Sequence, residues 1–183
     1  MFECYQRFIE VFQENPWAQT IGFLAVGVNV IAFITTKDKK FLLFMALSSA
    51  IWGLHFYLMG LFTASGVNFF DVIKNLIALK YKRNLFWMSI FLLIYATIGF
   101  FTFDPSNLFS LIPILNAFLS LFFVFYLKGI WLKSGFLLIL VLWFIYNIMG
   151  QSLGGMMSDI LLFISGLYGL IRIFLQEKKL RVA

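Results

Sequence analysis

The chain of 183 residues is 62% hydrophobic and 20% aromatic, and only 12% of its residues are charged. A soluble domain is usually about half apolar and about a quarter charged, so a water-soluble fold of this composition would expose large apolar patches. The composition therefore excludes a soluble protein and predicts a single-domain integral membrane protein. The net charge of +6 does not indicate nucleic-acid binding, because the basic residues stand in short gaps between apolar runs, where they orient a membrane protein.

The N-terminal segment, residues 1–15, precedes the apolar runs. Residues 2–14 place apolar side chains at helical spacing against polar ones, which predicts an amphipathic helix in the membrane interface, with a frayed polar tail as the alternative. No basic segment precedes an apolar stretch, so we expect no cleavable signal peptide and insertion through the first span. Cys4 is the single cysteine and permits no internal disulfide.

Seven apolar runs follow, each near the ~20 residues that a helix needs to cross ~30 Å of hydrocarbon. In lipid a span must satisfy its own backbone hydrogen bonds, so all seven are expected to be helices. The third run is the most polar and the sixth is the shortest. The runs cover residues 17–36, 41–62, 63–80, 85–103, 108–127, 134–150 and 154–175.

The basic residues predict the orientation of these spans. With seven spans, the Lys and Arg residues of the gaps after runs one, three and five share one face with those of the C-terminal end, and Arg7 stands on the other face. Positive loops favour the cytoplasm, so we expect the N-terminus outside and the C-terminus inside. A miscounted span would scatter this asymmetry.

The connections indicate an internal repeat. Residues 61–63 and 151–153 are very short links that make tight hairpins of runs two and three and of runs six and seven. The pattern is three spans, one linking span and three spans, so the two triplets are parallel repeats related by an axis along the membrane normal. We expect an all-α polytopic membrane protein divided into a first three-helix bundle (16–84), a linker helix (85–107), a second bundle (108–176) and a basic tail (177–183).

Several short motifs resemble a known family. They are Gly53-Leu54-His55-Phe56 with Gly60, then Asp71–Asn75, Gly150, Gly154-Gly155 and Ile171-Arg172. Together they resemble the YgjV-like bacterial inner-membrane family over residues 17–176. That family is similar to the SWEET and SemiSWEET sugar carriers, PQ-loop proteins and PnuC vitamin carriers, which implies two three-helix bundles around a central solute site. SWEET carriers place a proline in four pore helices, whereas this chain has only Pro113 within a span, so the resemblance does not extend to proline hinges.

Polar side chains inside the spans are the candidates for function, because ionisable groups in a bilayer are costly and mark cavities or relays. Asn68, Asp71 and Asn75 fall at i, i+3 and i+7, on one helical face. Asp71 stands about 13 Å along the helix from Lys80, near mid-membrane. Lys74 can pair with Asp71 at this spacing. In one reading this face lines a cavity, and Asp71 contacts a solute or exchanges a proton. In the other reading the Asp71–Lys74 pair is neutralised and holds helices together, while the Lys74 side chain extends toward the interface.

The single histidine, His55, also has two readings. An imidazole can titrate near neutral pH and serve in a pocket as a proton sensor or solute donor. It can equally stay neutral and hydrogen-bond a neighbouring helix. We favour the pocket because the Gly-x-His-Phe motif belongs to the resemblance.

The remaining candidates are amides and aromatic rings. Trp52 and Trp143 could stack on a flat or sugar-like ligand, and asparagines could bind a solute or join helices for ~0.6–2 kcal/mol each. Asp159 stands near the outer end of the seventh run, where one reading is a simply interfacial, hydrated carboxylate. The full set of expected solute-binding residues is Asn29, Trp52, His55, Asn68, Asp71, Asn75, Asn116, Trp143, Tyr146 and Asn147.

Catalytic and cofactor motifs are absent from the sequence, which has no GxSxG, HExxH, CxxC or Walker pattern. We therefore expect no enzyme, no metal and no cofactor. The leading hypothesis is a SWEET-like carrier in the bacterial inner membrane that moves a small neutral or cationic metabolite by alternating access. The alternative is a scaffold or accessory protein whose polar groups only pack helices. Its partners would be the lipid bilayer and the solute, and self-association into a homo-oligomer is left open.

Overall fold

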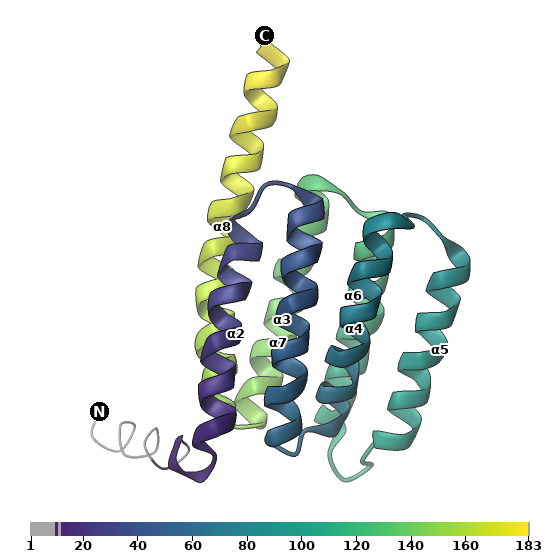
Figure 1. The fold of residues 1–183 in the computed structure, drawn as a ribbon, viewed down its shortest axis with the longest axis vertical. Helices are drawn as coiled ribbons and strands as arrows, with labels where there is room; N and C mark the ends of the chain where they lie inside the picture. The colour runs from purple at the N-terminus through teal and green to yellow at the C-terminus, as the bar shows by residue number, and fades with distance from the viewer. Residues whose placement is uncertain (1–9, 11, 183) are drawn as a thin grey trace.

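The computed structural model describes residue 10 and residues 12–182. The amphipathic helix expected near the N-terminus lies mostly outside the described residues. The described part of the chain forms α2 (Pro16–Ile34), α3 (Asp38–Leu58), α4 (Phe62–Lys80), α5 (Leu85–Thr102), the short 3-10 helix η1 (Leu108–Leu111), α6 (Ile112–Tyr126), α7 (Gly129–Met149) and α8 (Leu153–Val182) (Figure 1). Each predicted apolar run corresponds to one of these helices, with differences of several residues at some ends, and η1 and α6 share the fifth run.

Local sequence fixes where several helices begin. The Asn15 side chain accepts a hydrogen bond from the Ala18 N–H at 3.2 Å, and Pro16 occupies the first helical position, where its missing N–H costs nothing. Asn84 caps α5 in the same way, through the Trp87 N–H at 3.2 Å. Both helices therefore start at side chains that satisfy otherwise free backbone donors.

Within the described residues, six helices are long and apolar enough to cross a membrane: α2, α3, α5, α6 with η1, α7 and α8. The exception is α4, which has 19 residues but carries Asn68, Asp71, Lys74 and Asn75. Large apolar side chains cover the outside of the bundle, among them Trp17 and Phe100, which are 77% and 82% exposed. An apolar exterior around buried polar groups is the distribution that lipid demands.

The helices are arranged in a closed ring. Each packs against the next in the order α2, α3, α4, α6, α7, α8, and α8 packs back against α2. In Figure 1, α2, α3, α4 and α5 stand side by side in front of α6, α7 and α8. The ring leaves out α5, which packs mainly on α4 and α6 and buries Phe91 and Tyr95.

The ring has two ends, which differ in the connections that they carry. The basic end carries the connections α2–α3, α4–α5 and α6–α7 and lies at the top of Figure 1, where α8 projects beyond the other helices. The hairpin end carries the connections α3–α4, α5–α6 and α7–α8.

Glycines let α2 and α8 approach along their whole length. Near the hairpin end a Cβ at Gly154 would stand 3.2 Å from the Gly22 Cα, and near the basic end a Cβ at Gly169 would stand 2.3 Å from the Phe33 carbonyl oxygen. Backbone cannot move aside as a flexible side chain can. This interface therefore depends on small residues, as tight helix pairs in membranes commonly do.

Gly169→Ala is expected to destabilise the protein by about 1–3 kcal/mol, because the new methyl group forces α2 and α8 apart. The matched control is Gly27→Ala on the same helix pair, where a Cβ meets nothing within 4 Å, and which we expect to change stability by less than about 0.5 kcal/mol. Unfolding in mixed micelles by titration with a denaturing detergent measures both. Equal stability of the two variants would contradict this account of the interface.

Candidate functional site

A cavity of about 70 Å³ lies at the centre of the ring. All six ring helices contribute polar side chains to its wall, whereas α5 contributes none. These polar residues are Asn29 on α2, Ser48 and Ser49 on α3, Asn68 and Asp71 on α4, Asn116 and Ser120 on α6, Asn147 on α7, and Ser158 and Asp159 on α8. The cavity is thus a polar chamber inside an apolar protein.

Several of these polar groups have no hydrogen-bond partner among the described residues. They include the side-chain amide oxygen of Asn29, the Ser48 and Ser158 hydroxyls, and the side-chain amide oxygen and nitrogen of Asn116. Buried polar atoms are nearly always paired, and each unpaired one costs about 1–3 kcal/mol. Their concentration around one cavity indicates that it is suited to hold water or a polar solute.

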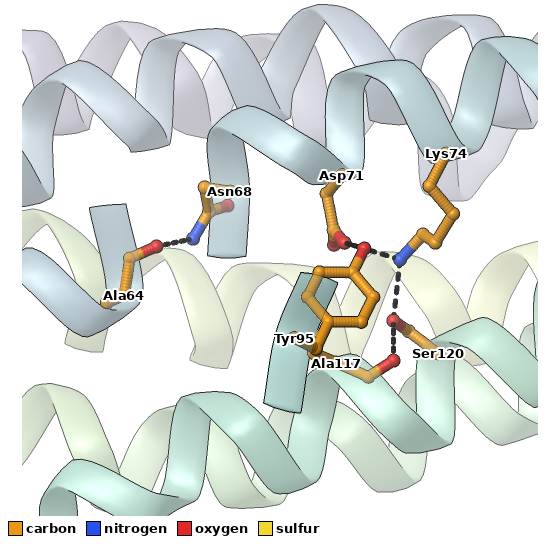
Figure 2. A network of polar contacts seen from close by, with 7 residues as sticks. All are labelled: Ala64, Asn68, Asp71, Lys74, Tyr95, Ala117 and Ser120. Atoms are coloured by element: carbon orange, nitrogen blue, oxygen red, sulfur yellow. Dashed lines mark hydrogen bonds and ion pairs between the residues drawn. The ribbon is translucent and has the colours of Figure 1, made fainter. Parts of the chain in front are cut away.

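On one side of the cavity, charged and hydroxyl groups from three helices form a network (Figure 2). Lys74 donates to the Asp71 carboxylate at 2.7 Å and to the Ser120 hydroxyl at 2.6 Å, and Ser120 donates to the Ala117 carbonyl oxygen at 3.0 Å. Tyr95 of α5 donates a hydrogen bond to the same Asp71 oxygen. The Lys74 side chain is 1% exposed and that of Asp71 is 17% exposed. Asp71 therefore both closes an ion pair and faces the cavity.

Asn68 lies one turn from this network and makes a local contact. Its amide nitrogen donates to the Ala64 carbonyl oxygen at 2.8 Å (Figure 2). That bond lies within α4 and joins no second helix. The rest of the Asn68 amide remains on the cavity wall.

The second carboxylate, Asp159, lies across the ring on α8. It is 7% exposed and accepts a hydrogen bond from the Asn147 amide of α7 at 2.8 Å. Asp159 is therefore buried among side chains, which does not fit the reading of a hydrated carboxylate. Neighbouring side chains of α7 and α8 shield it, and it also borders an apolar groove of about 240 Å³ between these helices.

Aromatic rings close the cavity toward the hairpin end. Phe56 stacks on Trp52 with centroids 5.6 Å apart and on Trp143 with centroids 5.6 Å apart. All three rings line the cavity. Phe56 thus fills the space between the two indoles where the sequence indicated a stacked ligand.

Beyond this stack, His55 joins three helices. Its Nδ1 lies 2.7 Å from the Ala18 carbonyl oxygen, and its Nε2 lies 2.8 Å from the Ser152 hydroxyl. A carbonyl oxygen only accepts, so Nδ1 donates, and in the neutral ring Nε2 accepts from Ser152. His55 is fully buried and lies outside the cavity lining. It ties α3 to the start of α2 and to the α7–α8 connection.

A second aromatic group closes the basic end. Phe41 meets Phe33 and Phe136 edge to face, at centroid distances of 5.7 and 5.0 Å. Beside it, Lys133 of α7 donates to the Phe33 carbonyl oxygen at 2.8 Å and to that of Thr35. A buried lysine therefore caps the C-terminal end of α2, where free carbonyls concentrate negative charge.

Further contacts tie the connections of the basic end together. The Asp38 carboxylate accepts the Gly129 N–H at 3.1 Å, which joins the start of α3 to the start of α7. Lys82, between α4 and α5, donates to the Val124 carbonyl oxygen of α6. Burial lowers the pKa of Lys82 below its ordinary value, Asp38 opposes that shift and Lys128 adds to it. The basic end is closed by capped helix termini.

The structure brings most of the expected solute-binding residues to one place. Those that line the cavity are Asn29, Trp52, Asn68, Asp71, Asn116, Trp143 and Asn147. Those that do not are His55, Asn75 and Tyr146. Asn75 is buried beyond the cavity on α4, and Tyr146 packs against Phe56 and borders a separate pocket at the hairpin end.

Sequence reasoning missed Tyr95, Ser48, Ser49 and Ser120. Each is a hydroxyl whose partner or cavity involves another helix, so spacing along the chain gives no signal for it. The sequence also indicated no partner for Lys133, which it assigned to the connection before the sixth run. Asp159 did stand out as a carboxylate within a predicted span, but its burial and its contact with Asn147 were not foreseen.

A ring of apolar helices around a polar cavity defines a multi-pass membrane protein with a candidate internal binding site. The sequence model of the Imp-YgjV family, described as "Bacterial inner membrane protein", matches residues 16–177. The chain therefore belongs to this family of bacterial inner membrane proteins. It is 28% identical to "Inner membrane protein YgjV" of Escherichia coli (strain K12) over 163 residues, 88% of this chain and 87% of the relative. No solved structure matches the chain.

Proposed function

We propose that this protein is a SWEET-like carrier that moves a small neutral or cationic solute across the bacterial inner membrane by alternating access. The observation that carries the proposal is the central cavity, which is walled by all six ring helices and lined by unpartnered amide and hydroxyl groups. A protein that used its polar groups only to join helices would be expected to pair them.

The arrangement of the ring supports two repeated bundles. α2, α3 and α4 follow one another around the ring, as do α6, α7 and α8, and the two sets meet at α4–α6 and α8–α2. The remaining helix, α5, stands outside as a linker would. In this proposal α4 is a seventh span whose polar residues face Tyr95, Ser120 and the cavity instead of lipid. Seven spans place the basic end in the cytoplasm.

The two aromatic closures support alternating access. In this proposal the Phe56 stack is the closure toward the hairpin end, and the Phe33–Phe41–Phe136 group is the closure toward the basic end. The volume of about 70 Å³ has room for a few water molecules, each of which needs about 10–15 Å³ by the same measure. The small cavity would then correspond to an occluded state, and a metabolite would enter when one closure separates.

The alternative, a non-transporting scaffold, is favoured by a different observation. His55, Lys74 and Lys133 are fully buried, and each joins helices through its polar atoms. Such contacts stabilise a bundle whether or not a solute passes. The two functions differ in whether the cavity opens to both membrane faces.

Accessibility of a single cysteine tests that difference. Ser48→Cys in a Cys4→Ser background puts a thiol of similar size on the cavity wall, where the hydroxyl is 1% exposed and unpartnered. A carrier is expected to let a membrane-impermeant methanethiosulfonate label this thiol from either face, in right-side-out and in inside-out vesicles, because each closure opens in turn. A scaffold leaves it unlabelled from both.

Two control variants frame the measurement. Leu93→Cys lies on the exposed apolar side of α5, outside the ring, where lipid would cover it, and is expected to stay unlabelled. Ser106→Cys lies in the exposed α5–α6 connection and is expected to react from the periplasmic face alone, which also reports the orientation. Labelling of Ser48→Cys from neither face, with Ser106→Cys reactive, would overturn the carrier proposal.

A further inference from the structure

The two carboxylates of the cavity differ in their partners. Asp71 is paired with the Lys74 ammonium at 2.7 Å. Asp159 accepts one hydrogen bond from a neutral amide, that of Asn147, and no Lys or Arg among the described residues forms an ion pair with it. A carboxylate taken out of water is costly unless a positive charge accompanies it. The cavity therefore carries one carboxylate whose charge the protein does not compensate.

The groups around Asp159 are suited to an organic cation. The unpartnered side-chain amide oxygens of Asn29, Asn116 and Asn147 are acceptors for N–H groups. They share the cavity wall with the rings of Trp52 and Trp143, and aromatic faces attract cations. Both the acceptors and the rings favour a ligand that carries positive charge and donates hydrogen bonds.

An inorganic cation fits this wall less well. Calcium takes about 6–8 oxygen ligands and magnesium requires a near-octahedral set. In the described part of the chain, no three His, Cys, Asp or Glu side chains come together as such ligands. The indole rings supply no oxygen at all.

We propose that the cavity binds a small organic cation, an ammonium or amidinium compound, with Asp159 as its counter-ion. This inference rests on the proposed carrier function and specifies the class of solute. In the closed state the volume of about 70 Å³ holds a cation of only a few non-hydrogen atoms. A larger amine requires the cavity to widen.

Probe pairs that match in shape and differ in charge test the inference. Acetamidinium and acetamide share one shape and differ in charge, as do methylammonium and methanol. The midpoint of thermal unfolding of the purified full chain in detergent is measured against each probe, at ionic strength held constant with N-methylglucamine chloride, a cation too large for the cavity. A ligand of four non-hydrogen atoms binds no tighter than about 40 µM, so the titrations extend through the millimolar range.

The wild-type protein is expected to bind each cation at least about tenfold more tightly than its neutral partner, as a charge-assisted contact provides. Asp159→Asn keeps the side-chain shape and is expected to abolish that difference. Asp104→Asn changes the net charge by the same amount at an exposed carboxylate of the α5–α6 connection, which does not line the cavity, and is expected to preserve it. Where Asp159→Asn does not fold, Asp159→Ser replaces it.

The outcomes separate this inference from the carrier proposal. Equal binding of cation and neutral partner by the wild type, or no binding of either, overturns it. So does a preference that survives in Asp159→Asn, or an equal response to sodium or potassium chloride alone. The cysteine labelling from both faces needs no ligand. If it succeeds while the charge preference fails, the carrier proposal stands and its solute is not this cation.

Discussion

Asp71→Ala is expected to lower the free energy of unfolding by about 3–5 kcal/mol, the cost of leaving one partner of a buried ion pair alone. Lys74 is fully buried, and its ammonium has Asp71 and Ser120 as partners. Without the carboxylate, the ammonium keeps only the Ser120 hydroxyl, and Tyr95 loses its acceptor. Detergent-induced unfolding in mixed micelles, followed by circular dichroism, measures the loss.

The double variant Asp71→Ala, Lys74→Met separates the charge from the packing. Removing both charges is often close to neutral, so we expect the double variant to regain most of the stability that the single variant loses. Asp104→Ala removes an exposed carboxylate from the α5–α6 connection and is expected to cost less than about 1 kcal/mol. A double variant as unstable as Asp71→Ala would show that the loss comes from the shape of the network and not from an unpaired charge.

The helices were largely predictable because length and hydropathy decide what crosses a bilayer. The error at α7 shows the limit of that rule. The sequence assigned Lys133 to a connection and began the span at residue 134, whereas α7 begins at Gly129. Lys133 lies inside the helix, fully buried, because the carbonyls at the end of α2 receive its ammonium. A single sequence does not show that partner.

The candidate site was predicted only in part, because helical periodicity shows which residues share a face but not what that face meets. Asn68 and Asp71 share a helical face, and that face meets the cavity, so periodicity was enough. Asn75 lies on the same helical face but beyond the cavity, and the spacing of residues does not show how far along the helix the cavity extends. His55 stood out as a lone histidine, yet its two partners come from distant parts of the chain, Ala18 and Ser152. The spacing of residues predicts which side chains share a helical face. It does not predict which groups of a neighbouring helix lie opposite them.

Phe56→Ala is expected to have the second large effect, because it removes the central ring of the closure at the hairpin end. Phe56 is 2% exposed, and the two indoles that it separates lose their common contact. Truncating a buried phenylalanine costs about 3–5 kcal/mol when the surroundings do not collapse. Phe100→Ala on the lipid-facing side of α5 removes the same atoms from an exposed position and is expected to change stability by about 0.5 kcal/mol or less.

The same substitution tests the closure itself when combined with the Ser48→Cys label. A gap between Trp52 and Trp143 admits the reagent from the hairpin end, so labelling from that face is expected to become at least about tenfold faster, as a shift of about 1.4 kcal/mol toward the open state would produce. Labelling from the other face is expected to change little, because Phe33, Phe41 and Phe136 remain in place. Equal acceleration from both faces would mean that the variant loosens the whole bundle. An acceleration confined to one face assigns Phe56 to the closure at that face.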